Sequence, residues 1–403
     1  MKLNCNNAFR KERLTVCFIL LILLHIAVIG LLSSVPPVSR DALTHHLALP
    51  KLYLQHGGIL ELPYMVVSYY PQLLDFIYCV PLYFKNDIVC KYIHFMFALG
   101  TAALLYSYLQ KRLSSVYGWL GAFLFLTVPI IVKLSITVYV DLGLVFFTTA
   151  ALYLLLYKWP HGGFQWKPLC LAGICAGLGA GTKYNGLIVI LLLTLLLPVL
   201  LPKVQRQSWK AVVFSVFFFC VSMAVFSPWM IRNYTWTGNP VYPLAKNTFS
   251  EMAPQDDSGQ PEPSGPRHLL LRKYLYQETA WETMSIPIRI FFQGEDNNPE
   301  YFDGVLHPFL FLLPLLGVVK VRNTIKSDLV LLIPFSVLFI LIVFFTTDMR
   351  IRYVTPALPG LVVLSIFGLY ILKTILLPAV FKSQRLVKAL FGFVLVTLFA
   401  FNL

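Results

Sequence analysis

The sequence is poor in charged residues. Asp, Glu, Lys and Arg make up 12% of its 403 residues, whereas a soluble domain usually has about 25%. Hydrophobic residues make up 58%, and the mean hydropathy is +0.73. These values argue against a water-soluble fold. The charge is mostly positive, with 32 basic and 18 acidic residues. Because the basic residues form short clusters between apolar runs, they are typical of membrane loops rather than of a nucleic-acid-binding surface.

Several patterns of other protein classes are missing. The seven cysteines show no CxxC spacing, which excludes a zinc ribbon and a disulfide framework. There is no Walker loop, no internal repeat and no stretch that could fold as a separate soluble domain. Carriers that work by alternating access often have two repeated halves and charges in mid-membrane, and this chain has neither. A pore or a pump is therefore not indicated.

Long apolar runs are abundant instead. A membrane-spanning helix needs about 20 mostly apolar residues, and the sequence predicts about eleven such segments. The first run is too long for the core of a signal peptide, so we expect it to be a retained span. The predicted spans lie near residues 14–34, 88–109, 116–132, 142–157, 168–181, 185–201, 211–227, 306–319, 329–346, 354–372 and 389–402.

The basic clusters predict the orientation. With a cytoplasmic N-terminus, every segment on the inner side is basic, as the positive-inside rule requires. Two long segments then face outward, residues 35–87 and 228–305. The first contains YYPQLLDFIYCVPLYF, a short apolar stretch broken by proline, which predicts an interfacial helix. We expect one transmembrane domain over residues 1–403 with two large outer loops that carry interfacial helices.

Ionisable residues near a membrane are costly and are candidates for function. Asp41 follows the first span, and Asp141 precedes the fourth, so both fall on the predicted outer face. Either side chain could simply cap a helix. Two carboxylates on one face also suit proton abstraction from a hydroxyl, or positioning of a hydroxyl or a metal.

Four basic side chains are candidates for binding an anionic group. Lys183 follows three glycines spaced four residues apart, which would let another helix approach closely, although a lysine at a helix end can also extend toward the interface. Arg350 and Arg352 lie on a predicted outer loop, against the positive-inside tendency, and Arg232 opens the second outer loop. The planar guanidinium of arginine binds phosphate oxygens in pairs.

Histidines raise the question of a metal. His45, His46 and His56 do not match a known ligand spacing, and neighbouring histidines on a helix point apart. Glu61, Asp75 and His307 would be further ligands, but no pattern selects them. We therefore expect no dedicated protein metal site, and a divalent metal stays open as a cofactor.

Taken in their order along the chain, the motifs that contain these residues resemble the GT-C superfamily of integral membrane glycosyltransferases, in particular bacterial relatives of the protein O-mannosyltransferase and aminoarabinose transferase group. The resemblance covers about residues 14–372. The chain has Pro-Gln at 71–72 where relatives often have Pro-Pro, and it lacks the WWDYG motif of oligosaccharyltransferases. The matching stretches are DALTHHLALPKLYL, YYPQLLDFIY, VYVDLGLVFFTTAAL, GLGAGTKYNGL, RNYTWTGNPVYP and RYVTPALPGL.

The resemblance implies a GT-C fold and roles for these residues. Asp41 matches the acid that binds or deprotonates the acceptor, and Asp141 matches a second acid. Arg352, with Lys183, Arg350 and Arg232, is expected to bind the phosphate of the carrier. The expected contacts to the acceptor or the sugar are His45, His46, Tyr70 and Tyr353.

The sequence therefore predicts a transferase that moves a hexosyl or pentosyl group from a polyprenyl-phosphate carrier to an acceptor hydroxyl at the outer face of the membrane. The expected location is the inner (cytoplasmic) membrane of a bacterial cell envelope, with membrane lipid and a glycan, lipid or protein acceptor as partners and no nucleic acid. A flippase for lipid-linked glycans and a non-catalytic membrane scaffold of the same fold are the alternatives. Neither the sugar, the acceptor nor the oligomeric state follows from the sequence.

Overall fold

The fold is all-α. The computed structural model describes residues 2–158, 165–200, 209–249, 267–317 and 323–401, and within these ranges it contains helices and turns but no strand. Each of the predicted apolar segments contains at least one helix. These helices are α1 (Lys2–Ser33), α4 (Asp87–Arg112), α5 (Ser115–Thr127), α6 (Pro129–Ser135), α7 (Asp141–Lys158), α8 (Trp166–Thr182), α9 (Asn185–Leu200), α11 (Trp209–Thr237), α15 (Phe309–Leu316), α16 (Asn323–Thr346), α17 (Leu358–Ile371) and α19 (Gln384–Ala400).

Several of these helices are long and apolar enough to cross a membrane. By length and composition, the described residues contain five such spans, or six if the bent pair α5 and α6 is one span. This pair bends by 68° at Val128, whose ψ of 125° is extended. The bend has a local cause, because the ring of Pro129 disfavours helical geometry in the residue before it. The structure confirms a polytopic helical membrane protein, and the count of about eleven crossings stays a prediction.

Short helices occupy the two segments that the sequence assigns to the outer side. Residues 35–87 contain a π-helical turn η1 (Ala42–His46), helix α2 (Ala48–His56), a 3-10 turn η2 (Val66–Tyr69) and helix α3 (Leu73–Tyr83). In the second segment, α11 continues to Thr237, past the predicted start at residue 228. It is followed by η3 (Lys246–Thr248), α12 (Arg267–Leu275), α13 (Ala280–Met284) and α14 (Ile286–Arg289). The outward orientation of both segments stays a prediction.

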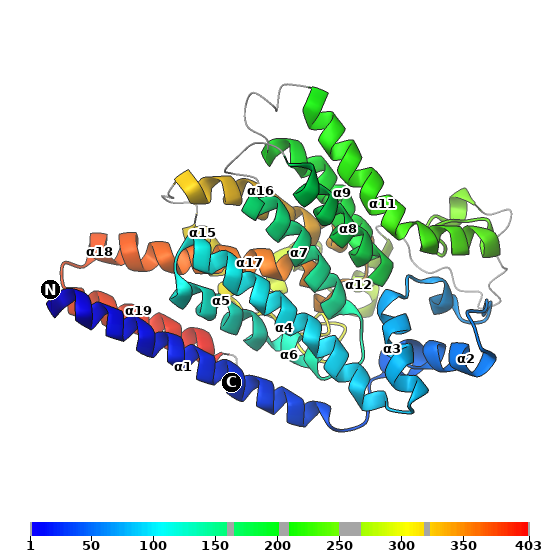
Figure 1. Cartoon of the computed structure of the whole chain (residues 1–403), viewed down its shortest axis with the longest axis horizontal. Coiled ribbons are helices and arrows are strands. Elements are labelled where there is room, and N and C mark those ends of the chain that lie inside the picture. The colour runs from blue at the N-terminus through cyan, green and yellow to red at the C-terminus, as the bar shows by residue number, and fades with distance from the viewer. Residues whose placement is uncertain (1, 159–164, 201–208, 250–266, 318–322, 402–403) are drawn as a thin grey trace. The chain divides into compact units, whose positions relative to one another are not determined.

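The chain divides into two compact units. Unit 1 comprises Met1–Ile29, Leu99–Lys133 and Gly265–Leu403, and unit 2 comprises Gly30–Ala98 and Leu134–Ser264. In unit 2, α8 lies against α7, α9 and α11 (Figure 1). The glycines before Lys183 explain how closely α11 approaches: a Cβ on Gly177 would lie 2.5 Å from the carbonyl oxygen of Ser222, and one on Gly181 would lie 2.6 Å from the indole nitrogen of Trp229. The predicted close approach of a helix to this face is confirmed.

The core of unit 1 is α17, which packs against α5, α15 and α16 and is buried along almost its whole length. It is preceded by the 3-10 segment η4 (Ile351–Ala357) and followed by the short elements η5 (Leu372–Leu376) and α18 (Leu377–Val380). An ion pair of 2.8 Å between Arg112 Nε and Asp328 Oδ2 joins the end of α4 to α16, and only 1% of the Asp328 side chain is exposed.

Candidate functional site

Asp41 lies immediately before the π-helical turn η1 and is partly exposed. The turn is closed by a hydrogen bond of 2.9 Å from the Leu47 N–H to the Ala42 carbonyl. A π-turn is wider than an α-turn and is frequent at functional sites. The Asp41 carboxylate accepts no capping hydrogen bond from this turn. The capping alternative for Asp41 therefore finds no support in the geometry.

The same turn ends with His46, which is held by a buried carboxylate. His46 Nδ1 lies 2.8 Å from Asp75 Oδ1, and the two side chains are 18% and 5% exposed. Asp75 is on α3, 29 residues away in the chain. A carboxylate oxygen accepts hydrogen bonds, so this contact assigns the donor role to Nδ1 of His46. His45 lies beside it, with a centroid distance of 6.3 Å between the two rings.

Asp141 begins α7 and is paired with Lys183. Lys183 Nζ lies 2.7 Å from Asp141 Oδ1, and the side chains are 22% and 3% exposed. Lys183 lies in the short connection between α8 and α9, so the pair links the start of one helix to the end of another. The ammonium group compensates the charge of an almost fully buried carboxylate. The first turn of α7 also receives support from α4, where buried His94 Nε2 accepts the N–H of Leu142 at 3.0 Å.

Asp41 and Asp141 border the same apolar cluster. Ala42, next to Asp41, and Val140, next to Asp141, both pack in a core cluster that also contains Tyr78 of α3. Burial raises the pKa of Tyr78 well above its ordinary value, and the charges of Asp75 and Asp141 add to this effect. One buried phenol is thus within electrostatic reach of two carboxylates. Unit 2 therefore gathers acidic groups from η1, α3 and α7 around one cluster.

Arg232, on α11, is surrounded by neutral acceptors. Its guanidinium donates to the carbonyl of Tyr70 at 2.9 Å, to Gln72 Oε1 at 3.1 Å and to Asn233 Oδ1 at 2.9 Å. It also lies 5.0 Å from the ring centroid of Trp236 and 5.2 Å from that of Trp229. In the described part of the chain, no ion pair to a carboxylate is found for Arg232. The neutral partners therefore do not compensate the positive charge of Arg232.

Asn233 links Arg232 to the connection between α8 and α9, which contains Lys183. Its side chain is fully buried and donates from Nδ2 to the Tyr184 hydroxyl at 2.9 Å and to the Tyr69 carbonyl at 2.8 Å. Tyr184 directly follows Lys183, and its own hydroxyl donates to the Tyr242 carbonyl at 2.6 Å. Burial raises the pKa of Tyr184 far above its ordinary value, so this hydroxyl stays a donor. The hydrogen bonds thus join Arg232 to the loop that holds Asp141.

Arg350, Arg352 and Tyr353 belong to unit 1, and the other predicted site residues belong to unit 2. Arg350 Nε donates to Asp348 Oδ2 at 3.1 Å, and its Nη1 is 3.9 Å from Asp303 Oδ2. The guanidinium of Arg352 lies 5.3 Å from the centroid of the Tyr353 ring. Within unit 1, the charge of Arg350 is therefore compensated by carboxylates, and Arg352 is stacked on its neighbour.

The described residues contain no group of three or more His, Cys, Asp or Glu side chains placed to hold a metal ion. Asp75 does not gather with other ligands but pairs with His46. Sequence reasoning did not predict the roles of Asp75, His94 and Asn233. Asp75 and Asn233 lie inside the motifs that were singled out, whereas no local signal marks His94 in its apolar run.

Comparisons with known proteins agree with this fold. A family model described as dolichyl-phosphate-mannose-protein mannosyltransferase matches residues 81–231, a range that includes Asp141 and Lys183. No curated protein matches the sequence.

Among solved structures, ArnT from Cupriavidus metallidurans bound to undecaprenyl phosphate is 14% identical with a TM-score of 0.56, over 87% of this chain and 60% of that one. The apo state of the same ArnT is 14% identical with a TM-score of 0.57, over 88% of this chain and 59% of that one. The oligosaccharyltransferase AglB from Archaeoglobus fulgidus, in complex with an inhibitory peptide and a dolichol-phosphate, is 13% identical with a TM-score of 0.51, over 93% and 54%.

These likenesses show that the chain has the GT-C fold. The fold that the resemblance implies is confirmed. The chain spans about 60% of the length of the ArnT chain that it matches, so activity, substrates and partners are matters for proposal.

Proposed function

We propose that this protein is a lipid-linked sugar transferase, which moves a glycosyl group from a polyprenyl-phosphate carrier to an acceptor hydroxyl. The observation that carries the proposal is the arrangement of Asp41 and Asp141 around one cluster of unit 2, on the GT-C fold. Undecaprenyl phosphate in ArnT and dolichol-phosphate in AglB support a carrier of this class. The description of the matching family model supports transfer of a sugar from such a carrier.

The chemistry that these residues would perform is a direct displacement. The acceptor oxygen attacks the anomeric carbon, the bond from that carbon to the phosphate oxygen breaks, and the hydroxyl proton passes to the carboxylate of Asp41. Asp41 suits this role because it is partly exposed and lies directly before the π-helical turn η1. Asp141 would orient the acceptor or Asp41, with Lys183 holding its carboxylate in place.

The departing phosphate carries negative charge that must be stabilised. Arg232 suits this role because its present partners are neutral, whereas Lys183 and Arg350 already pair with carboxylates. Arg352 and Arg350 stay proposed phosphate ligands on the basis of the family resemblance. His45, His46, Tyr70 and Tyr353 stay proposed contacts to the acceptor or the sugar.

The chain is a multi-pass membrane protein. We propose the inner (cytoplasmic) membrane as its location, with a cytoplasmic N-terminus and the reaction at the outer face, on the basis of the basic clusters. The acceptor class, whether glycan, lipid or protein, and the choice between hexosyl and pentosyl groups belong to the same proposal.

Asp41→Asn tests the function. Asparagine preserves size and hydrogen bonding but cannot accept the proton, and general-base catalysis typically contributes about 10²–10⁴-fold. We therefore expect sugar release from undecaprenyl-phosphate-linked mannose or aminoarabinose to fall by at least about 10²-fold, with unchanged protein level and carrier binding. Asp87→Asn is the matched control, because Asp87 is a partly exposed carboxylate in unit 2 that pairs with Lys51 at 2.7 Å.

Two outcomes would contradict the proposal. Turnover of Asp41→Asn close to that of the wild type and of the control would remove Asp41 from catalysis and leave Asp141 as the better candidate. A wild-type protein that binds the carrier and moves it across a bilayer without cleaving the sugar would support the flippase, and one that does neither would support the scaffold.

A further inference from the structure

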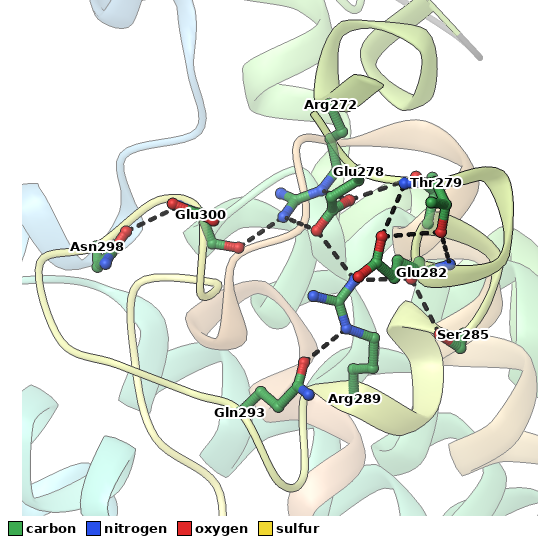
Figure 2. A network of polar contacts seen from close by, with 10 residues as sticks. Arg272, Glu278, Thr279, Glu282, Ser285, Arg289, Gln293, Asn298 and Glu300 are labelled. Carbon is green, nitrogen blue, oxygen red and sulfur yellow. Dashed lines mark hydrogen bonds and ion pairs between the residues drawn. The ribbon is translucent and has the colours of Figure 1, made fainter. Parts of the chain in front are cut away.

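The segment 267–293 of unit 1, which contains α12, α13 and α14, has a pair of opposite charges on the inside. Arg272 and Glu278 are only 7% and 6% exposed. They form a bidentate pair, with Nε 2.7 Å from Oε2 and Nη2 2.9 Å from Oε1 (Figure 2). Such a fork is the strongest geometry for an arginine and a carboxylate. The centre of this segment is therefore ionic rather than apolar.

Further polar groups complete this network. Arg289 Nη1 donates to Glu278 Oε1 at 2.9 Å and to the carbonyl of Glu282 at 2.7 Å, and Thr283 Oγ1 donates to Glu278 Oε2 at 3.3 Å (Figure 2). Arg272 Nη2 also donates to the Glu300 carbonyl at 2.6 Å. Burial by itself would raise the pKa of Glu278, but its bonds to the two arginines outweigh burial and lower that pKa. The network is internally satisfied, so it offers no open site for a ligand.

The outer surface of the same segment is apolar and aromatic. A helix at a water-facing surface normally buries such side chains and exposes its charges, and large exposed apolar patches on proteins mark contact surfaces. Here Arg272 and Glu278 are buried, and large apolar side chains are exposed beside Lys273 and Glu282. The exposed side chains are Leu270 (63%), Tyr274 (79%), Leu275 (66%), Trp281 (79%), Met284 (58%) and Phe292 (50%).

This apolar surface is continuous with helices of the membrane domain. The rings of Phe291 and Phe292 lie 5.6 and 5.9 Å from the ring of Phe311 on α15. Helix α14 also lies against α16, which contains one of the membrane spans. The segment is thus anchored at its C-terminal end beside elements that contact lipid.

We propose that the apolar surface of segment 267–293 docks on the lipid bilayer, with Trp281 and Tyr274 at the level of the head groups. Tryptophan and tyrosine favour this depth because they combine an apolar ring with a polar group. Exposed Lys273, next to Tyr274, adds attraction to anionic lipid. The buried ion network then keeps Arg272 and Glu278 away from lipid while the apolar side chains face outward. This proposal does not depend on the transferase activity.

The test measures what surrounds individual side chains of the full-length protein in nanodiscs of phosphatidylcholine and phosphatidylglycerol. In a background cleared of native cysteines, spin labels are attached to Trp281→Cys and, separately, Leu275→Cys. Collision rates with oxygen, which concentrates in lipid, are compared with those of a nickel chelate, which stays in water. Glu295→Cys is the control, since this side chain is exposed in the polar loop after the segment.

We expect the oxygen-to-nickel ratio at positions 281 and 275 to exceed the ratio at position 295 several-fold. High nickel accessibility at both positions would place the surface in water and overturn the proposal. Low accessibility to both reagents would show a protein partner, such as a second copy of the chain, and would also overturn it.

A second measurement avoids the cysteine background. In nanodiscs that contain brominated phosphatidylcholine, the quenched tryptophan emission of the wild type should exceed that of Trp281→Phe. Equal quenching in the two proteins would count against lipid contact at this residue.

Discussion

The pair of Asp141 and Lys183 permits a quantitative prediction. Asp141→Asn removes the carboxylate charge that lies 2.7 Å from Lys183 Nζ. Breaking a fully buried pair costs about 3–5 kcal/mol, because an unpaired charge stays behind. Since 22% of the Lys183 side chain is exposed, water can solvate the ammonium in part, and we expect a cost of about 2 kcal/mol.

The assay is thermal unfolding of the purified protein in nanodiscs, followed by intrinsic fluorescence. Asp141→Asn should lower the apparent Tm clearly, whereas Asp348→Asn should not. Asp348 pairs with Arg350 at a similar distance of 3.1 Å but is 64% exposed, and exposed pairs contribute about 0–1 kcal/mol. The double variant Asp141→Asn/Lys183→Gln should regain most of the lost stability, because neither charge is then left unpaired.

Equal Tm values for Asp141→Asn and Asp348→Asn would refute the burial argument. The double variant also separates two roles of Asp141. If Asp141 orients the acceptor or Asp41, stability should recover without sugar transfer. If sugar transfer recovers together with stability, the pair belongs to the scaffold and not to the reaction.

Three further predictions concern the carrier, pH and topology. Arg352→Ala should weaken binding of undecaprenyl phosphate by about 1.5–3 kcal/mol, the contribution of a charge-assisted hydrogen bond. Arg352→Lys should recover only part of the lost affinity, because lysine lacks the planar fork. Unchanged affinity of both variants in titration calorimetry would point to Arg232 instead. The arginines lower the pKa of Glu278 in the folded protein. The contribution of Glu278 to stability should therefore be complete above its unfolded pKa of about 4.3 and should be lost as the pH falls through the lower folded pKa. Tm measured from pH 6 to pH 3 should show this loss in the wild type and not in Glu278→Gln, and parallel Tm curves of the two proteins would contradict the prediction. A membrane-impermeant thiol reagent added to intact cells should label Glu295→Cys but not Gln384→Cys, both at exposed positions, and the reverse pattern would invert the topology.

Much of the fold could be predicted from the sequence because the signal is local. A membrane-spanning helix satisfies its own backbone hydrogen bonds and needs only a long apolar run, and each predicted run contains a helix. The glycines before Lys183 likewise predicted a close helix approach, since a missing side chain leaves the same space in any context. The bend between α5 and α6 is also local in origin, because it follows from Pro129.

The partners of the candidate residues could not be predicted in this way. Lys183 and Asp141 are 42 residues apart, and His46 and Asp75 are 29 apart, so only the packing of separate helices brings their charges within 3 Å. The sequence singled out Asp41, Asp141 and Arg232 because ionisable groups are rare in it, but it did not show that Asp141 is ion-paired while Arg232 has neutral partners. That difference is the reason for proposing Arg232 ahead of Lys183 as a ligand of the phosphate.

The segment 267–293 shows most clearly where sequence reasoning ends. Its leucines, arginines and aromatic residues are mixed along the chain, so the sequence does not say which of them face a protein core, water or lipid. The direction was decided by tertiary structure alone. Arg272 and Arg289 turn inward because Glu278, supplied by the turn between two short helices, offers both of them a carboxylate, and the apolar side chains are left outside.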